Sequence, residues 1–434
     1  MSAPQPGSRP SGTPLPRELL PDTAAVGSSG QLFIGGCDTL ELAAEFGTPL
    51  FVYDEAHLRS RCREALAAFG DGVAYATKAF LCRAMARLVY EEGLHLDVAS
   101  GGELGVALAA GVPADRIVVH GNNKATAELV AAREAGVGRV VVDSFDELDR
   151  LDALHASDGR VARVLLRVTP GVEAHTHEYV RTGQDDSKFG FGLVSGDAAR
   201  AVERAQGAAS VELVGIHAHI GSQVFVAGFF EQAVEALAPF VVPLGLPELS
   251  IGGGLGVAYV AGETAPSITE WGTVVRLACE HHGITARVSA EPGRAIAAAA
   301  AVTLYTAGTI KELPGIRTYV ACDGGFIDNP RPALYGSGYE TFLPRALAAS
   351  RGLSVRLVGK HCESGDVLVH EAAVPADLAV GDVIATPVTG AYGRSMGSNY
   401  NWLPRPAAVF VADGDARLVI RRETFDDLLA TDVG

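Results

Sequence analysis

The feature that most constrains the fold is a regular alternation of short apolar runs and longer helix-like stretches between residues 50 and 300. Eight short runs are rich in Val, Ile and Leu, as strands buried on both faces of a parallel sheet are; they cover residues 73–78, 95–100, 117–121, 139–144, 163–168, 213–221, 249–254 and 287–293. The stretches between them have helical periodicity and cover residues 82–92, 103–110, 125–135, 145–154, 197–206, 229–241 and 268–281. Eight strand–helix units in about 240 residues match the size of a (β/α)8 TIM-like barrel. An open, doubly wound sheet has the same alternation and remains the alternative.

The pattern changes after residue 300, where short strands are separated by Gly, Pro and Asp; they cover residues 302–309, 317–322, 355–359, 367–370, 383–387, 407–411 and 416–421. We therefore expect an α/β chain in which a (β/α)8 barrel, residues 51–300, is followed by a mainly β C-terminal domain, residues 301–434. Residues 31–50, which include the strand-like segment 32–34, are expected to join the β domain. Residues 1–30 contain six prolines and no apolar h-region, so we expect a disordered tail and not a signal peptide.

The charge balance argues against several classes of partner. The chain has 35 Lys and Arg against 51 Asp and Glu, a formal net charge of −16, which disfavours nucleic-acid and anionic membrane surfaces. No apolar stretch reaches the length of a membrane span. The six cysteines are scattered without a CxxC pair, which fits a reducing cytoplasm and argues against a disulfide framework.

Polar residues stand where the expected barrel strands end, and active sites of such barrels lie at the C-terminal ends of the strands. Any one of these residues has the simpler explanation of a solvated strand end, but together they suggest a ring around one pocket: Lys78, Asp97, His120, Asp143, Arg167, His219 with Ser222, Gly252–Gly254, and Glu291 with Arg294.

Lys78 is the most informative member of this set. The chain has five lysines and thirty arginines, so arginine supplies most of the positive charge. Unlike arginine, lysine can lose its proton and attack a carbonyl to form a Schiff base. A lysine whose apolar stem lies along the surface is the alternative interpretation.

A phosphate site is suggested by Gly252, Gly253 and Gly254, which follow a strand and are expected to open a helix, and by the hydroxyl of Ser222. A Schiff-base lysine, a phosphate cradle and an acid at Glu291 together indicate pyridoxal phosphate, with Glu291 facing the pyridine nitrogen. The pairs His175/His177 and His217/His219 lack a third ligand at suitable spacing, so we expect no metal site. One ring stacking on a flat cofactor explains His219 better.

The β domain contains further candidates. Cys362 lies beside Glu363 and Asp366, and a thiol can deliver a proton to a carbanion. Arg331, Tyr335 and Tyr392 supply a guanidinium and phenols that suit phosphate or carboxylate groups.

These motifs occur together in the order seen in one family. They are YATKA at 75–79, HGNNK at 120–124, HIGSQ at 219–223, GGGLG at 252–256, EPGR at 291–294, RPALY at 331–335, CES at 362–364 and GAY at 390–392. Over about residues 30 to 430 the chain resembles the diaminopimelate decarboxylases, pyridoxal-phosphate enzymes of the alanine-racemase fold class.

The resemblance implies a role for each matching residue. Lys78 resembles the Schiff-base lysine, and Cys362 the proton donor. The implied cofactor contacts are Lys78, Asp97, His219, Ser222, Gly252, Gly253, Gly254, Glu291, Gly293, Arg294 and Tyr392. The implied substrate contacts are Arg294, Arg331, Tyr335, Glu363 and Tyr392. In the family, Cys362 and Glu363 would reach the partner's active site, which implies a homodimer with composite sites.

The expected activity is decarboxylation of meso-2,6-diaminopimelate to L-lysine and carbon dioxide. Phe326 and Ile327 stand where the family usually has Met and a small polar residue, and Arg394 and Gly397 also depart from its pattern. A decarboxylase of a related or carrier-bound amino acid in a specialised pathway is therefore the alternative. The carboxylate at Glu291 argues against a racemase, and the presence of Lys78, Cys362 and the β domain argues against a catalytically silent cofactor-binding protein.

Overall fold

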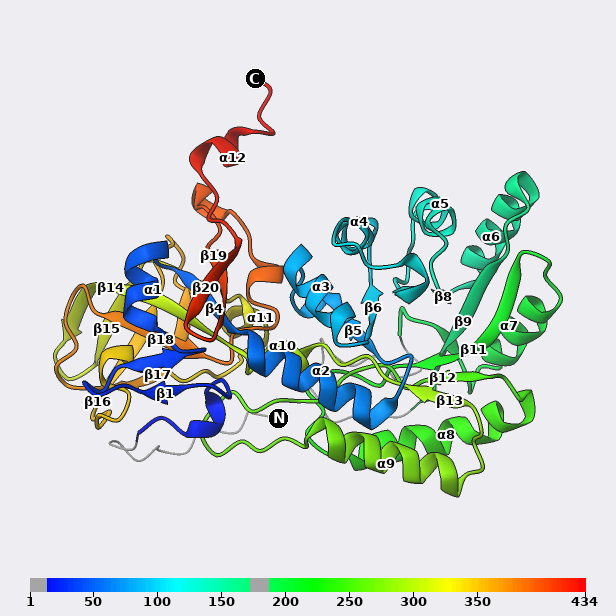
Figure 1. Cartoon of the computed structure of the whole chain (residues 1–434), viewed down its shortest axis with the longest axis horizontal. Coiled ribbons are helices and arrows are strands. Elements are labelled where there is room, and N and C mark those ends of the chain that lie inside the picture. The colour runs from blue at the N-terminus through cyan, green and yellow to red at the C-terminus, as the bar shows by residue number, and fades with distance from the viewer. Residues whose placement is uncertain (1–13, 172–186) are drawn as a thin grey trace. The chain divides into compact units, whose positions relative to one another are not determined.

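The structure, a computed structural model, describes residues 14–171 and 187–434 and divides into two compact units (Figure 1). The barrel unit comprises Arg59–Val257 and Thr264–Ala297. The β unit comprises the described residues up to Leu58, the short segment Ala258–Glu263 and Ala298–Gly434. Each unit is therefore assembled from segments that are separate in the sequence.

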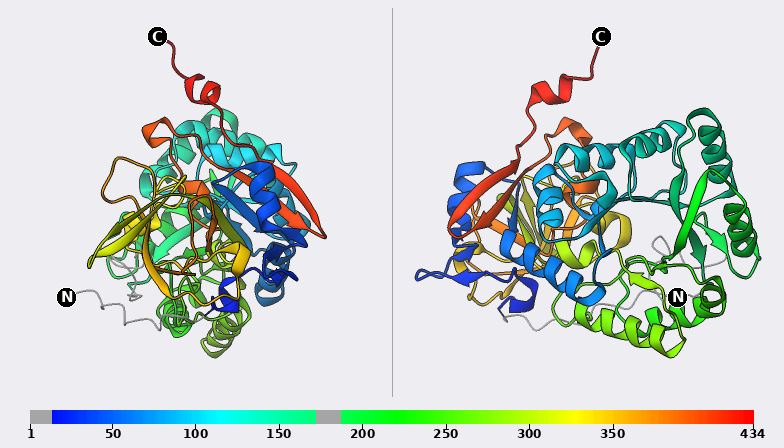
Figure 2. Two further views of the ribbon diagram at one scale, coloured as in Figure 1. Left: turned by 90° about the vertical axis from the view of Figure 1, so that its left-hand side faces the viewer. Right: turned by 45° about the vertical axis from the view of Figure 1, so that its right-hand side comes forward.

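The barrel unit contains eight parallel strands in the order β13-β12-β11-β9-β8-β7-β6-β5, with helices outside them (Figure 2). The strands are β5 (Ala74–Ala76), β6 (His95–Val98), β7 (Ile117–Val119), β8 (Arg139–Val142), β9 (Ala162–Thr169), β11 (Val211–Ala218), β12 (Glu248–Ser250) and β13 (Arg287–Ser289). A short strand, β10 (Phe191–Gly192), pairs with β9. The amides of Ala74 and Ala76 donate to the carbonyls of Ala290 and Pro292, which brings the first strand against the last. The expected barrel is confirmed, and the open sheet is not observed.

Side chains fill the interior of this barrel, as the size of an eight-stranded barrel requires. Val118, Val141, Leu165 and Val214 come from four neighbouring strands and form one buried cluster. Most observed strands are shorter than the expected runs, because Lys78, His120, Asp143 and Glu291 lie beyond the last paired residues of their strands. Asp97 and Arg167 lie within β6 and β9.

Three helices of the barrel unit begin at a serine whose side chain satisfies a free backbone amide. Ser100, Ser144 and Ser267 each accept a hydrogen bond from the amide three residues later and so cap α4, α6 and α9. The helices are α2 (Glu55–Phe69), α3 (Arg83–Glu91), α4 (Gly101–Ala109), α5 (Thr126–Ala135), α6 (Phe145–Asp158), α7 (Asp197–Gln206), α8 (Gly228–Leu244), α9 (Ile268–His281) and α10 (Arg294–Ala297). Within the described ranges, no helix combines the length and apolar character needed to cross a bilayer.

The β unit is built on a sheet with the order β17-β16-β15-β14-β4-β19-β20, and β18 also pairs with β14. Its strands are β4 (Leu50–Asp54), β14 (Ala301–Leu313), β15 (Arg317–Cys322), β16 (Leu353–Val358), β17 (Val367–Val374), β18 (Val383–Pro387), β19 (Ala407–Ala412) and β20 (Asp415–Ile420). Short helices α11 (Arg331–Tyr335) and α12 (Phe425–Leu429) complete the C-terminal part. The mainly β character expected for this region is observed.

The expected barrel boundary at residue 51 is wrong because β4 belongs to the β unit. This strand pairs with β14 on one side and with β19 on the other, and its five residues are all buried. Its apolar composition suits a barrel strand equally well, so composition alone does not distinguish the two sheets.

The expected disordered tail is also wrong for residues 14–30, while residues 1–13 lie outside the described part of the chain. Arg17–Leu19 form a 3-10 turn, and Leu15, Leu19 and Leu20 are buried. The strands β1 (Ala25–Val26), β2 (Leu32–Ile34) and β3 (Cys37–Asp38) form a small antiparallel sheet of their own, followed by α1 (Thr39–Phe46). The free energy gained by burying these leucines offsets the cost of ordering a segment that its prolines suggested to be disordered.

Candidate active site

The C-terminal ends of the barrel strands gather the titratable side chains that the sequence singled out. Lys78 lies in a 3-10 turn, Thr77–Ala79, directly after β5. The hydroxyl of Thr77 donates to the carbonyl of Asp97 at 2.8 Å and contacts a carboxylate oxygen of Glu103 at 2.8 Å. These contacts fix the turn that carries Lys78. Lys78 is an exposed residue, and its charge acts on the buried Asp97.

Glu291, which follows β13, is a buried carboxylate held on both oxygens. Its Oε2 lies 3.0 Å from Nε2 of His217, and Ser250 donates to its Oε1 at 2.8 Å. Burial alone would raise the pKa of Glu291, but His217 and His120 outweigh it and hold the pKa well below its usual value. Glu291 is thus an oriented anion, as expected for a partner of a protonated pyridine nitrogen.

The ring of His219 is fixed by the glycine turn. The amide of Gly253 donates to Nδ1 of His219 at 3.1 Å, so Nδ1 is an acceptor. Burial, together with the charge of Lys78, lowers the pKa of His219 well below its usual value. The ring is therefore a neutral, oriented surface, which suits stacking on a planar cofactor.

An anion cradle lies beside this ring. The guanidinium of Arg294 donates to Oγ of Ser222 at 3.0 Å, which joins two of the residues expected to bind the cofactor. Gly252 and Gly254 have φ values of +67° and +116°, and a Cβ on either would approach a backbone oxygen closer than 2.6 Å. Only glycine suits these two positions, and the cradle depends on the turn that they form.

The expectation that Gly252–Gly254 open a helix is wrong. The chain beyond them forms an isolated bridge between Leu255 and Val224, and the next helix, α9, begins only at Ile268. The left-handed glycines direct the chain away from a helical path. Gly293 has a packing role, because a Cβ there would lie 2.9 Å from the carbonyl oxygen of Ala76.

A lysine amine, a neutral imidazole plane, an arginine–serine anion cradle and a buried carboxylate thus occur at one end of one barrel. This donor set fits pyridoxal phosphate: the amine suits its aldehyde, the cradle its phosphate and the carboxylate its ring nitrogen.

The β unit holds a buried guanidinium at Arg331, the first residue of α11. Its Nη1 donates to Oη of Tyr339 at 2.5 Å, and its Cζ lies 4.0 Å from the centroid of the Tyr259 ring. Within the described ranges no ion pair joins Arg331 to a carboxylate, and the groups that act most strongly on its charge are tyrosines. A buried cation without a counter-charge is costly, and an anionic ligand would compensate it.

The segment that carries Cys362 and Glu363 is held in place by a buried carboxylate. Asp366 accepts the amides of Phe326 at 2.7 Å and of His361 at 2.9 Å, while the thiol of Cys362 is exposed. Glu363 accepts a hydrogen bond from Oη of Tyr400 at 2.6 Å.

Phe326, one of the departures from the family pattern, packs beside this segment. Its ring lies 4.9 Å from that of His361 and 5.6 Å from that of Tyr400, measured between centroids. Phe326 therefore supports the same tyrosine that contacts Glu363. Arg394, another departure, donates through Nε to the carbonyl of Pro406.

Tyr335 and Tyr392 are half-buried residues of the β unit. Tyr392 has φ +59°, an unfavourable conformation for a bulky residue, and such strain is concentrated at functional sites. Tyr335 is the last residue of α11.

Sequence reasoning missed several residues of this site. The sequence assigns no role to Ser250 or Tyr259, and for His217 it suggests at most a metal ligand. The HxH spacing of His217 and His219 was the available signal, because alternate residues of a strand share a face. His175 and His177 lie outside the described residues.

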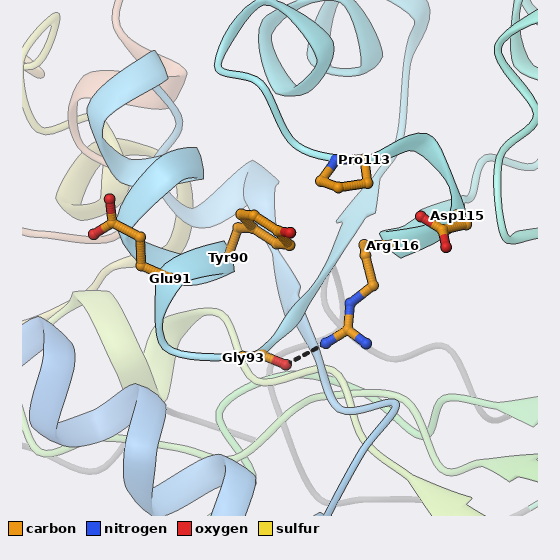
Figure 3. Close-up of a pocket in the computed structure, with 6 residues that line it drawn as sticks. All are labelled: Tyr90, Glu91, Gly93, Pro113, Asp115 and Arg116. Carbon is orange, nitrogen blue, oxygen red and sulfur yellow. Dashed lines mark hydrogen bonds between the residues drawn. The ribbon is translucent and has the colours of Figure 1, made fainter.

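A surface pocket lies at the other end of the barrel strands (Figure 3). It is lined by Tyr90, Glu91, Gly93, Pro113, Asp115 and Arg116, and Arg116 donates to the carbonyl of Gly93 at 2.6 Å. These residues precede β6 and β7, whereas the candidate site follows the strands. None of the expected site residues lines this pocket.

Comparisons with known proteins agree with the geometry. Residues 55–298 match the family described as pyridoxal-dependent decarboxylase, pyridoxal binding domain. The diaminopimelate decarboxylase of Mycobacterium tuberculosis H37Rv is 48% identical, covering 93% of this chain and 95% of that protein. The enzyme of that name from Bacillus subtilis is 44% identical, covering 96% and 98%. The crystal structure of the M. jannaschii diaminopimelate decarboxylase with L-lysine aligns with a TM-score of 0.88 at 33% identity, covering 95% and 98%. The chain therefore belongs to the diaminopimelate decarboxylase family of pyridoxal-dependent decarboxylases.

Proposed function

We propose that this protein decarboxylates meso-2,6-diaminopimelate at its D-configured centre and releases L-lysine and carbon dioxide. The single observation that carries the proposal is the buried Glu291 carboxylate, oriented by His217 and Ser250 at the same end of the barrel as Lys78. An anion at this position keeps the nitrogen of a bound pyridine ring protonated, which suits decarboxylation.

Pyridoxal phosphate, when bound, supplies an aldehyde that links covalently to amines and a ring that accepts the electron pair released when carbon dioxide leaves. Lys78 supplies the amine that holds the cofactor. Ser222 and Arg294, with the turn formed by Gly252–Gly254 beside them, would bind its phosphate. His219 presents a neutral ring face, and Glu291 holds a proton at the pyridine nitrogen.

The β unit supplies the groups proposed to bind substrate. Arg331 binds a substrate carboxylate through its paired N–H groups, with Tyr335 and Tyr392 beside the substrate. Glu363 binds the distal amino group. The bond between the α-carbon and its carboxylate breaks, and the Cys362 thiol delivers the proton that takes the place of carbon dioxide.

The proposed assembly is a homodimer in which Cys362 and Glu363 of one protomer serve the site of its partner. The exposure of the Cys362 thiol supports this assignment, because a proton donor for another chain must lie at the surface. We place the protein in the cytoplasm, in agreement with six free cysteines.

A related or carrier-bound amino acid is the second candidate substrate, favoured by the position of Phe326 beside Tyr400. The test is lysine formation and carbon dioxide release from meso-diaminopimelate, compared with a panel of amino acids, with Lys78→Ala as the inactive control. Release from another panel member without turnover of meso-diaminopimelate would overturn the first proposal.

A further inference from the structure

A histidine that follows β7 lies between two carboxylates of the candidate site. Nε2 of His120 is 3.4 Å from Oε1 of Glu291 and 3.6 Å from Oδ1 of Asp97. Its ring packs edge-on against that of His217, with centroids 4.9 Å apart and planes at 69°. All four side chains are buried. One imidazole is therefore shared by two acids in a medium that excludes water.

Two carboxylates in such an environment do not both stay ionised without compensation. Burial raises the pKa of Asp97 to about 6, although His120 opposes this effect. Burial would lower the pKa of His120, but Asp97 and Glu291 outweigh it and raise the pKa. An imidazolium at His120 is thus favoured by the same two anions that it stabilises.

Other charged groups also act on this cluster. Lys78 favours the anionic form of Asp97, whereas Glu103 from α4 opposes it. Arg167 from β9 opposes a charge on His120. Nη1 of Arg167 lies 3.8 Å from Oδ2 of Asp143, so the carboxylate of Asp143 partly neutralises the charge of Arg167. His217 also favours the anionic form of Glu291, with its Nε2 3.0 Å from Oε2, but among the described residues only His120 lies within ion-pair distance of both Asp97 and Glu291.

We propose that His120 is a positioning residue that bridges Asp97 and Glu291 and keeps both carboxylates anionic when the cofactor binds. The inference rests on the proposed role of Glu291 toward the cofactor ring. Without a cation between the two acids, the pair takes up a proton near neutral pH. Cofactor binding then competes with that proton.

The test is the affinity of the apoprotein for pyridoxal phosphate, measured from the cofactor absorbance between pH 6 and pH 9. His120→Asn keeps a hydrogen-bond donor but removes the charge. Relative to wild type, the dissociation constant of this variant should rise as pH falls, by up to about tenfold per pH unit below the pKa of the pair. The phosphate of the cofactor also titrates in this pH range. Its effect on the dissociation constant is the same for all variants, so it cancels when each variant is compared with wild type.

His95→Asn is the matched control. His95 is also a buried barrel histidine, but it lies at the start of β6, with Nε2 3.6 Å from Asp71. Its variant should follow the wild-type pH profile. Identical profiles for His120→Asn and wild type would overturn the proposal.

A second measurement does not depend on how the variant folds. In wild-type protein with labelled histidine, the nitrogen chemical shifts of His120 should show an imidazolium that persists to a higher pH than that of a free histidine, whereas His95 should be neutral at pH 7. A His120 that loses its proton at a lower pH than a free histidine would overturn the proposal. Glu291→Gln distinguishes failure of the proposed function from failure of this inference. If Glu291→Gln leaves the affinity for pyridoxal phosphate unchanged, the proposed role of Glu291 is wrong. If Glu291→Gln lowers the affinity but His120→Asn follows the wild-type pH profile, only the proposed role of His120 is wrong.

Discussion

Replacement of Arg331 by lysine tests the proposed substrate carboxylate site most directly. The guanidinium is buried, donates a hydrogen bond to the hydroxyl of Tyr339 and lies over the ring of Tyr259. Lysine keeps the charge but loses the planar pair of donors that matches a carboxylate. The expected loss is that of one charge-assisted interaction, about 3 kcal/mol. At about 1.4 kcal/mol per factor of ten, kcat/KM should fall by roughly 10²-fold.

The same environment predicts a different effect on stability. Because no described carboxylate pairs with Arg331, Arg331→Met removes an uncompensated buried charge. The midpoint of thermal unfolding of the apoprotein should stay unchanged or rise, although activity is lost. A site residue that costs stability is a known trade-off.

The assay is steady-state decarboxylation of meso-diaminopimelate, accompanied by thermal unfolding of each variant. Arg317→Lys is the matched control, since Arg317 also lies over a tyrosine ring, 5.9 Å from the centroid of Tyr319, but is exposed. An unchanged kcat/KM in Arg331→Lys would remove this residue from the site. Loss of activity together with a lower unfolding midpoint in both Arg331 variants would assign it a structural role.

Three further predictions concern the catalytic groups. Lys78→Ala should lose covalent cofactor, and borohydride reduction of wild type followed by peptide mapping should label Lys78; labelling of another lysine would refute the assignment. Lys78→Ala and Cys362→Ala should each be inactive, but their mixture should recover about a quarter of wild-type activity after subunit exchange. Half of the dimers are then hybrids, and each hybrid has one intact site of two. If mass spectrometry shows exchange but no activity returns, Cys362 serves the active site of its own protomer. Tyr400→Phe should raise KM more than it lowers kcat, because it removes the hydroxyl that contacts Glu363. Tyr319→Phe, the control, should change neither constant. If Tyr400→Phe weakened the binding of D-2-aminopimelate, which lacks the distal amine, as much as it weakened the binding of meso-diaminopimelate, this role would be contradicted.

The barrel could be predicted from the sequence because local periodicity determines it. Each strand–helix unit contacts its neighbours in order, so short apolar runs and helical stretches suffice. The ends of those runs also indicated that Lys78, Asp97, His219 and Glu291 lie at one end of the barrel, since parallel strands bring their C-terminal ends together; their roles stay predictions.

What remained unpredictable depends on contacts between distant segments. The bridge of His120 between Asp97 and Glu291 joins a residue within β6 to residues that follow β7 and β13, and no spacing in the sequence indicates it. Tyr259 belongs to a six-residue segment that leaves the barrel unit to join the β unit, where it contacts Arg331. No periodic pattern marks such a short excursion.

The position of β4 has a consequence for how the chain is made. This apolar strand is synthesised about 250 residues before β14 and about 350 before β19, the two strands that cover its edges. At about 5–20 residues per second, the nascent chain carries it without partners for some tens of seconds. The barrel unit can form in that interval, but Leu50–Asp54 must wait for the last part of the chain to leave the ribosome. A chain that stops before β19 keeps one edge of this strand open to pairing with other chains.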